Sequence, residues 1–287
     1  MTNSNFSELL DLQLRPIVEA ALAEDIRSGD ITTAALIPAS ATARASMIFR
    51  EEAVVCGLRA AELAFLILEP NLQISRHSHE GDRVVPGTLA LLVEGPARPI
   101  LTAERVALNL VQRLSGVATA TRRYVDLVEG TGVRIVEIRK TTPGLRLLEK
   151  YAVRCGGGMN HRFALDDLIL IKDNHIAVCG GIVPAIERAR AHSGHAVKIE
   201  VECDTLEQVG EAAQCGADII LFDNMGPHML RAAVEIVAGR ALTEASGGIN
   251  LGSVRAAAET GVDIISVGAL THSVIAIDVG LDLETVV

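Results

Sequence analysis

The sequence predicts an α/β protein, an incomplete (β/α) barrel that follows a smaller N-terminal α+β domain. The first observation is a regular alternation after Gly132, where short β-rich runs are each followed by a helix-like stretch. The second is that nearly every run ends in a polar or glycine residue. The third is composition, because 49% of the residues are hydrophobic but only 2% are aromatic. A core of small branched residues is typical of helices packed on a parallel sheet.

The first domain is expected to span residues 1–113 and to lack a βα repeat. Apolar residues at helical spacing predict a helix over residues 9–24, followed by a loop at Glu24–Thr33 that is rich in turn and capping residues. The elements expected next are a strand within Ala41–Cys56, a helix over Leu58–Leu68 and two strands within Leu72–Val93.

The second domain is expected to span residues 114–272 and to form the barrel. A long helical region over Ile100–Val128 leads into it, with a break expected at Ser115–Gly116. The tail, residues 273–287, is strand-like, and folding back onto the first domain is one option for it.

The strand ends decide between a barrel and an open sheet. The predicted strands are Val133–Ile138, Leu168–Ile171, Val197–Val201, Ile219–Phe222, Ala241–Thr243 and Ile264–Val267. They end at Arg139-Lys140, Lys172, Glu202, Asp223-Asn224, Ser246-Gly247-Gly248 and Gly268. A barrel gathers all its strand ends at one catalytic face, whereas an open sheet uses only those near its switch point. The pattern therefore favours a barrel with fewer than eight units.

Charge and hydropathy exclude several classes of partner. The net charge of −10 argues against nucleic-acid binding, which needs a broad basic face. The first 16 residues lack the features of a signal peptide, and no apolar run approaches the roughly 20 residues that span a bilayer. We therefore expect a cytoplasmic protein without a membrane or nucleic-acid partner. The 5 cysteines never occur as CxxC, which argues against a disulfide framework and a zinc site.

Cationic side chains gather at the first two predicted strand ends. Arg139 and Lys140 end one strand, Lys172 ends the next, and His161 and Arg162 follow a glycine run between them. Arginine binds carboxylate or phosphate at two points, and lysine supplies a mobile charge. The sequence thus predicts a pocket for a small polyanion, with separate surface salt bridges as the alternative.

Acidic residues end the next two strands. Glu202 and Asp223 can together hold Mg²⁺ or accept hydrogen bonds from sugar hydroxyls, which suggests a phosphorylated sugar as a ligand. Glu200 lies on the same side of its strand as Glu202, so periodicity leaves either residue as the ligand. A salt bridge to Lys172 or Lys198 is the alternative role for this acidic pair.

Glycine-rich turns follow the last two strands, at Ser246-Gly247-Gly248 and Val267-Gly268-Ala269. Successive late βα loops with free backbone N–H groups are the usual phosphate site of barrel enzymes.

The motifs together resemble the quinolinate phosphoribosyltransferases. The matching segments are EDIRSGDITT, ERVALNLVQRLSG, RKTTPGLR, KYAVRCGGGMNHR, LIKDNHI, KIEVE, LFDN, EASGGI and SVGALTHS. The resemblance covers nearly the whole chain and implies an enzyme that joins quinolinate to 5-phosphoribosyl 1-pyrophosphate with Mg²⁺. The implied products are nicotinate mononucleotide, pyrophosphate and CO₂, in NAD biosynthesis. It also implies a homodimer with shared active sites, with a hexamer as a further option.

The resemblance also assigns roles to residues. Arg139, His161, Arg162 and Lys172 match carboxylate-binding residues, and Arg105 matches an arginine contributed by the partner subunit. Lys140 matches a lysine between the dicarboxylate and the pyrophosphate, with Glu202 and Asp223 matching the acidic pair for ribose and metal. The two glycine-rich turns, Ser246–Gly248 and Val267–Ala269, match the 5-phosphate loops.

Two positions depart from the family pattern. Ile138 stands where the family usually has threonine, and Ala164 where it often has glycine. Loss of a hydroxyl at Ile138 would weaken binding by about 1 kcal/mol or change specificity. The alternatives are therefore a paralogue acting on another aromatic acid, of the molybdenum-transport-associated type, and a non-catalytic phosphate-metabolite binder.

Overall fold

A computed structural model describes residues 9–285 of the chain, so part of the N-terminal stretch tested for a signal peptide lies outside the described residues. The chain divides into two compact units. Unit 1 comprises residues 1–122, 141–157 and 273–287, and unit 2 comprises residues 123–140 and 158–272. Among the described residues, no helix combines the length and apolarity needed to cross a membrane.

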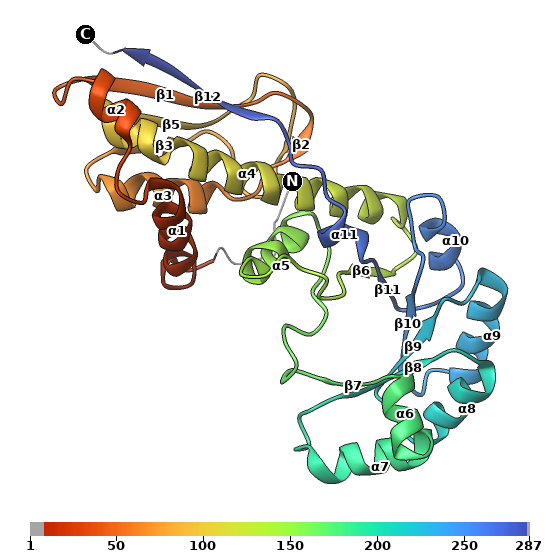
Figure 1. The fold of residues 1–287 in the computed structure, drawn as a ribbon. Helices are drawn as coiled ribbons and strands as arrows, with labels where there is room; N and C mark the ends of the chain where they lie inside the picture. Colours follow the sequence, from red (N-terminus) through yellow and green to blue (C-terminus); the bar gives the residue numbers. More distant parts are fainter. Residues whose placement is uncertain (1–8, 286–287) are drawn as a thin grey trace. The chain divides into compact units, whose positions relative to one another are not determined.

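Unit 1 combines an antiparallel sheet with helices, as the sequence predicts for the first domain (Figure 1). Its strands are β1 (Thr42–Phe49), β2 (Ala53–Val54), β3 (Gln73–Arg76), β4 (Arg83–Val84), β5 (Leu89–Pro96) and β12 (Val279–Thr285). Its helices are α1 (Asp11–Ile26), α2 (Ile31–Leu36), α3 (Leu58–Leu68), α5 (Arg146–Cys155) and the part of α4 (Ala97–Leu127) up to residue 122.

The main sheet of unit 1 has the strand order β12-β1-β5-β3. Alternate residues of β1 are buried, because one face of a strand carries every second side chain. The tail joins this sheet, since β12 pairs with β1 over the register Ala43–Thr285 to Phe49–Val279. In the expected loop at 24–33, α1 ends at Ile26 and α2 begins at Ile31. Asp30 caps α2 by accepting a hydrogen bond of 2.9 Å from the Thr33 N–H.

The break expected at Ser115–Gly116 is wrong, because α4 continues through both residues. Gly116 lies so close to the tail that a Cβ there would overlap the backbone oxygen of Ile275. The Ser115 hydroxyl accepts from the Cys56 N–H (3.0 Å) and donates to the Cys56 carbonyl (3.1 Å). These residues therefore mark close packing on the helix rather than its interruption.

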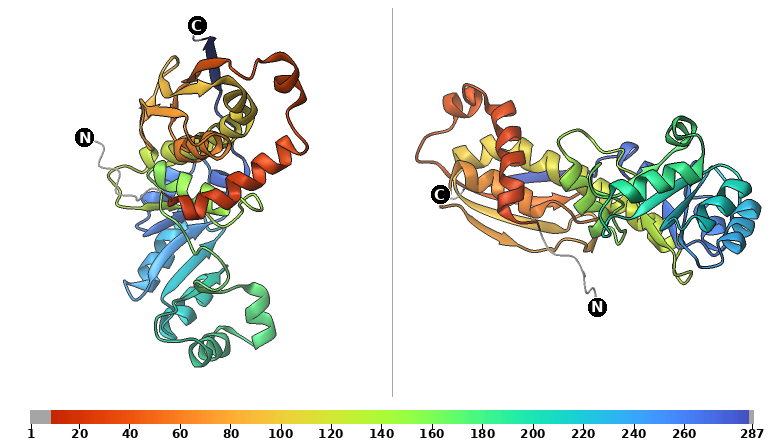
Figure 2. Two further views of the ribbon diagram at one scale, coloured as in Figure 1. Left: turned by 90° about the vertical axis from the view of Figure 1, so that its left-hand side faces the viewer. Right: turned by 90° about the horizontal axis from the view of Figure 1, so that it is seen from below.

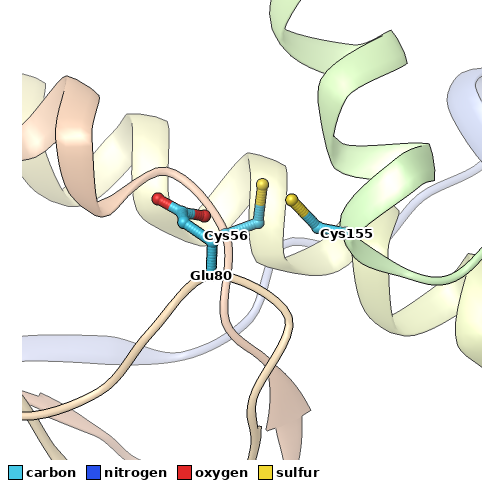
Figure 3. A group of neighbouring side chains, drawn as sticks. All are labelled: Cys56, Glu80 and Cys155. Atoms are coloured by element: carbon cyan, nitrogen blue, oxygen red, sulfur yellow. The ribbon is translucent and has the colours of Figure 1, made fainter. Parts of the chain in front are cut away.

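A buried polar cluster lies in unit 1 at the start of α3 (Figure 3). The Glu80 carboxylate accepts hydrogen bonds from the N–H groups of Gly57 (2.9 Å) and Arg59 (3.4 Å), and so caps the helix. The thiols of Cys56 and Cys155 lie beside it, with the ligand atoms of all three residues within 4.8 Å of one another. Burial raises the pKa of Glu80 to about 7 and that of the Cys56 thiol well above its usual range.

Unit 2 contains a parallel sheet of 6 strands with the order β6-β11-β10-β9-β8-β7, which confirms the predicted α/β class (Figures 1 and 2). Its strands are β6 (Arg134–Val136), β7 (Ile169–Ile171), β8 (Ile199–Cys203), β9 (Ile219–Asp223), β10 (Leu242–Ser246) and β11 (Ile264–Ser266). Its complete helices are α6 (Asp173–Cys179), α7 (Ile182–His192), α8 (Leu206–Gln214), α9 (Pro227–Val237), α10 (Val254–Ala258) and α11 (Ala269–His272). The edge strands β6 and β7 do not pair with each other, so the barrel is incomplete.

Candidate active site

A polar pocket lies at the carboxyl ends of the strands of unit 2, where parallel strands of a barrel are expected to place a catalytic site. The pairing of the strands determines which residues lie at the mouth of the pocket and which lie deeper. Ser246 is paired with Asp223 at the mouth, while Glu244 lies two residues further down the same strand. The pocket is lined by Ile138, Arg139, Lys140, His161, Arg162, Leu170, Lys172, Glu202, Leu221, Asp223, Asn224, Glu244, Ser246, Gly247, Gly248, Ile249, Ser266, Gly268, Ala269 and His272.

One wall of the pocket is cationic. Arg139 adopts a left-handed conformation with φ 60°, which is uncommon for a residue with a side chain, and its buried Nε has no hydrogen-bond partner in the described part of the chain. Lys140 is exposed at the mouth, and its carbonyl oxygen accepts a hydrogen bond of 3.0 Å from the Thr271 hydroxyl. Burial and the nearby charge of Arg139 lower the pKa of Arg162. This wall therefore favours an anionic ligand that relieves the repulsion between the guanidinium groups.

His161 lies at the base of this wall with both ring nitrogens close to other protein groups. Its Nδ1 accepts a hydrogen bond of 2.7 Å from the Arg162 N–H, and its Nε2 lies 3.1 Å from the Glu200 carboxylate. Glu244 is 3.7 Å away. Burial lowers the pKa of His161, but the adjacent Glu200 carboxylate and the other surrounding carboxylates outweigh it, so the pKa is raised. Burial and the charge of Glu200 raise the pKa of Glu244 to about 7.

A second wall carries the two acidic residues predicted from the sequence. Glu202 forms a 2.6 Å ion pair with Lys172, the salt bridge that the sequence left as an alternative. Asp223 accepts a 2.6 Å hydrogen bond from the Asn224 side chain. Glu202 is partly exposed to the pocket, whereas Glu200 is fully buried beneath it. Two accessible carboxylates fit the oxygen ligands that Mg²⁺ requires.

A glycine turn after β10 completes the mouth. Gly247 has φ +87°, and a Cβ there would overlap the Asn224 side chain. The Asn224 N–H donates to the Ser246 carbonyl oxygen at 2.9 Å, so the two strand ends are tied together. Glycine is required here because the turn needs both a positive φ and a close approach.

The structure brings together most of the residues predicted from the sequence. Val267 is buried and does not line the pocket, and Arg105 lies in unit 1 with a side chain that is 70% exposed. Sequence reasoning missed several lining residues, namely Leu170, Leu221, Glu244, Ile249, Ser266 and His272, and it named Asn224 only as part of a strand end. Glu244 could have been found, because it precedes Ser246 by two residues and shares its face of the strand.

These features indicate an α/β enzyme that binds a small anionic ligand, with anion-binding, acidic and glycine-rich walls around one pocket. Family models for the N-terminal and C-terminal domains of quinolinate phosphoribosyl transferase match residues 30–115 and 117–282. The chain therefore belongs to the quinolinate phosphoribosyltransferase family.

Individual relatives match over nearly the whole chain. A probable nicotinate-nucleotide pyrophosphorylase (carboxylating) of Bacillus subtilis (strain 168) is 45% identical over 272 residues, or 95% of this chain and 94% of that protein. The nicotinate-nucleotide pyrophosphorylase (carboxylating) of Mycobacterium leprae (strain TN) is 44% identical over 278 residues, or 94% and 96%. The crystal structure of NadC from Streptococcus pyogenes superposes with a TM-score of 0.95 at 38% identity, covering 98% of this chain and 100% of that one.

Proposed function

We propose that the pocket of unit 2 carries out the reaction of the family, phosphoribosyl transfer from 5-phosphoribosyl 1-pyrophosphate to quinolinate with loss of CO₂. The products are nicotinate mononucleotide, pyrophosphate and CO₂, which places the enzyme in NAD biosynthesis. The observation that carries this proposal is the meeting of cationic, acidic and glycine-rich strand ends in one pocket.

The cationic wall would hold quinolinate. Arg139, Arg162 and Lys172 supply positive charge for its two carboxylates, and the turn at His161 aligns Arg162 through the 2.7 Å hydrogen bond. Lys140 lies at the end of the same wall, where it can neutralise the departing pyrophosphate. Ile138 presents an apolar side chain beside Gly268 and His272, at a position where the family usually has a hydroxyl.

The other walls would hold the donor. Glu202 and Asp223 would hold the ribose hydroxyls and Mg²⁺, and the backbone N–H groups of Ser246–Gly248 and Gly268–Ala269 would bind the 5-phosphate. Mg²⁺ bound here would neutralise negative charge on the pyrophosphate.

Catalysis then depends on position and electrostatics. The C1–oxygen bond to pyrophosphate breaks, the ring nitrogen of quinolinate forms the new bond to C1, and positive charge develops on the ribose between them. Fixed carboxylates near the ribose and fixed cations near the pyrophosphate stabilise that charge distribution. The quaternised ring nitrogen next accepts the electron pair left by the departing CO₂, and a proton from water replaces the carboxylate.

The assembly we propose is a homodimer that acts in the cytoplasm, in which Arg105 of one subunit contributes to the pocket of the other. Its support is the exposed Arg105 side chain, which forms a 3.7 Å ion pair with Glu104. A hexamer built from such dimers would keep Arg105 of one subunit in the pocket of the other.

The test of the reaction is direct. Purified protein is incubated with quinolinate, Mg²⁺ and 5-phosphoribosyl 1-pyrophosphate, and loss of quinolinate is followed together with release of CO₂. We expect the two to proceed in equal amounts. Absence of turnover, with no thermal protection by quinolinate, would contradict the proposed function. Turnover of another aromatic acid in its place would indicate the paralogous activity.

A further inference from the structure

Glu137 is a fully buried residue directly after β6 that does not line the pocket. Its carboxylate nevertheless contacts both cationic segments of the site. Oε2 accepts a hydrogen bond of 2.8 Å from the Arg139 N–H, and Oε1 accepts one of 3.1 Å from the His161 N–H. A single side chain therefore connects the turn that carries Arg139 and Lys140 to the turn that carries His161 and Arg162.

The first of these hydrogen bonds holds a strained backbone. Arg139 has φ 60°, a left-handed conformation that is unfavourable for a residue with a side chain. Such a conformation persists only where its surroundings fix it. The Glu137 carboxylate does so by accepting the N–H of the strained residue itself.

The second hydrogen bond, from the His161 N–H, holds the turn with His161 and Arg162 beside the turn with Arg139 and Lys140. The segment before His161 already runs beside β6, because the Met159 N–H donates to the Ile135 carbonyl oxygen at 2.8 Å. Glu137 extends that pairing to His161, whose ring is held by Glu200 and by the Arg162 N–H. The separation of the two turns is thus set by the two oxygens of one carboxylate.

Holding the two turns close together has an electrostatic cost. The charge of Arg139 contributes to lowering the pKa of Arg162, so the two guanidinium groups repel each other. Cations that are held close together before a ligand arrives form a preorganised site for an anion with two negative groups. An anion with one negative group gains less from the fixed spacing.

We propose that Glu137 is a positioning residue that fixes the spacing of the two cationic turns and thereby selects a vicinal dicarboxylate over a monocarboxylate. The proposal rests on the proposed function, in which these cations bind quinolinate. Glu137 itself touches no substrate. It acts through the backbone of Arg139 and His161.

The test compares Glu137→Gln with the wild-type protein. The amide has one accepting oxygen, so it leaves one of the two N–H groups without an acceptor. We expect the dissociation constant for quinolinate, measured by calorimetry, to rise about tenfold or more. The constants for nicotinate, which has one carboxylate, and for 5-phosphoribosyl 1-pyrophosphate with Mg²⁺ should change little. An unchanged ratio of quinolinate to nicotinate affinity would overturn the proposal.

Two further variants separate positioning from general destabilisation. Glu137→Asp keeps the charge but is one methylene shorter, so its carboxylate cannot reach both N–H groups. It should therefore show the same loss of selectivity, and it replaces Glu137→Gln in the test if that variant does not fold. Thr243→Val is the matched control, because Thr243 exchanges hydrogen bonds with Asp263 (2.7 and 3.0 Å) at the end of β10 that faces away from the pocket. It should lower thermal stability and leave the affinity ratio unchanged. An equal loss of selectivity in Thr243→Val would assign the effect to instability and reject positioning.

Arg139→Ala distinguishes the proposed role of Glu137 from the proposed function of the pocket. If Arg139→Ala leaves quinolinate binding intact, the cationic wall is not the quinolinate site and the proposed function of the pocket fails. If Arg139→Ala weakens binding while both Glu137 variants keep the wild-type affinity ratio, the pocket assignment stands and the role of Glu137 alone is rejected.

Discussion

Both units bury carboxylates against backbone N–H groups, but the two clusters have different surroundings. In unit 1, Glu80 caps α3 beside the thiols of Cys56 and Cys155. In unit 2, Glu137 and Glu200 lie under a pocket and hold the turns that carry its cations. The comparison teaches that buried polarity alone does not mark an active site. A functional role follows where the buried groups support polar strand ends that converge on a shared pocket.

The largest expected loss of turnover follows replacement of Lys140, which lies at the mouth of the pocket. Lys140→Ala should lower kcat by about 10²- to 10³-fold, because a cation that neutralises the leaving pyrophosphate is lost. The melting temperature should stay near the wild-type value, since Lys140 is exposed. Steady-state kinetics and thermal unfolding measure the two quantities. Near wild-type activity would mean that the cationic wall is misassigned.

The same variant tests the shared site. If the proposed homodimer shares its sites, Lys140→Ala and Arg105→Ala should each have strongly reduced turnover on their own. When they are mixed and subunits exchange, one pocket of each mixed dimer should contain both wild-type side chains. Recovery of turnover on mixing supports a site completed by a second copy, and its absence after proven exchange contradicts it.

A smaller loss is expected at Gly247. In Gly247→Ala, the new methyl group would displace the Asn224 side chain, which donates to Asp223 at 2.6 Å. We expect turnover to fall about tenfold or more, because an acidic group of the site is moved. Gly130→Ala is the matched control, since Gly130 has a similar φ of +80° with no atom near its missing Cβ. It should show only the shared backbone strain, seen as lower thermal stability. Equal activities of Gly247→Ala and Gly130→Ala would show that the contact of residue 247 with Asn224 does not affect turnover.

In unit 1 the expected effect is on stability and its pH dependence. The pKa of Glu80 is about 7 in the folded protein, above its usual value of 4.5. The folded state therefore binds more protons between these pH values, and the contribution of Glu80 to stability is full below pH 4.5 and lost as pH rises through 7. Glu80→Gln does not titrate. Its free energy of unfolding relative to wild type should rise by at most about 3 kcal/mol between pH 5 and pH 8.

Urea unfolding at the two pH values checks this prediction. The activity per folded molecule should be unchanged in Glu80→Gln. A large loss of turnover without a change in stability would break the distinction between the two buried clusters.

The smallest expected effect is at Ile138, whose Cδ1 lies against Gly268. Ile138→Thr introduces a hydroxyl, and one added hydrogen bond of about 1 kcal/mol corresponds to a roughly fivefold lower KM for quinolinate. Ile138→Val keeps an apolar side chain and should leave KM unchanged. A higher KM in Ile138→Thr would indicate that this pocket depends on the apolar contact.

The strand ends of unit 2 were predictable because they depend on short-range patterns. Runs of β-branched residues and the residues that follow them locate the parallel strands, and parallel strands place their carboxyl ends together. Lys140, Glu202, Asp223 and Gly247 all meet in one pocket on that basis. Periodicity could not separate Glu200 from Glu202, since both point to the same side of β8. The position of the pocket along the strand decides between them.

By itself the sequence determined the α/β class, the family and the chemistry of the pocket walls, because these depend on residue type and local spacing. The tertiary structure alone decided which buried groups meet. It showed that Gly116 serves a close approach of the tail to α4, that Cys56 and Cys155 lie together, and that Glu137 bridges two turns. Such contacts join residues far apart in the chain, and no local pattern encodes them. They form only when packing brings the segments to the same place.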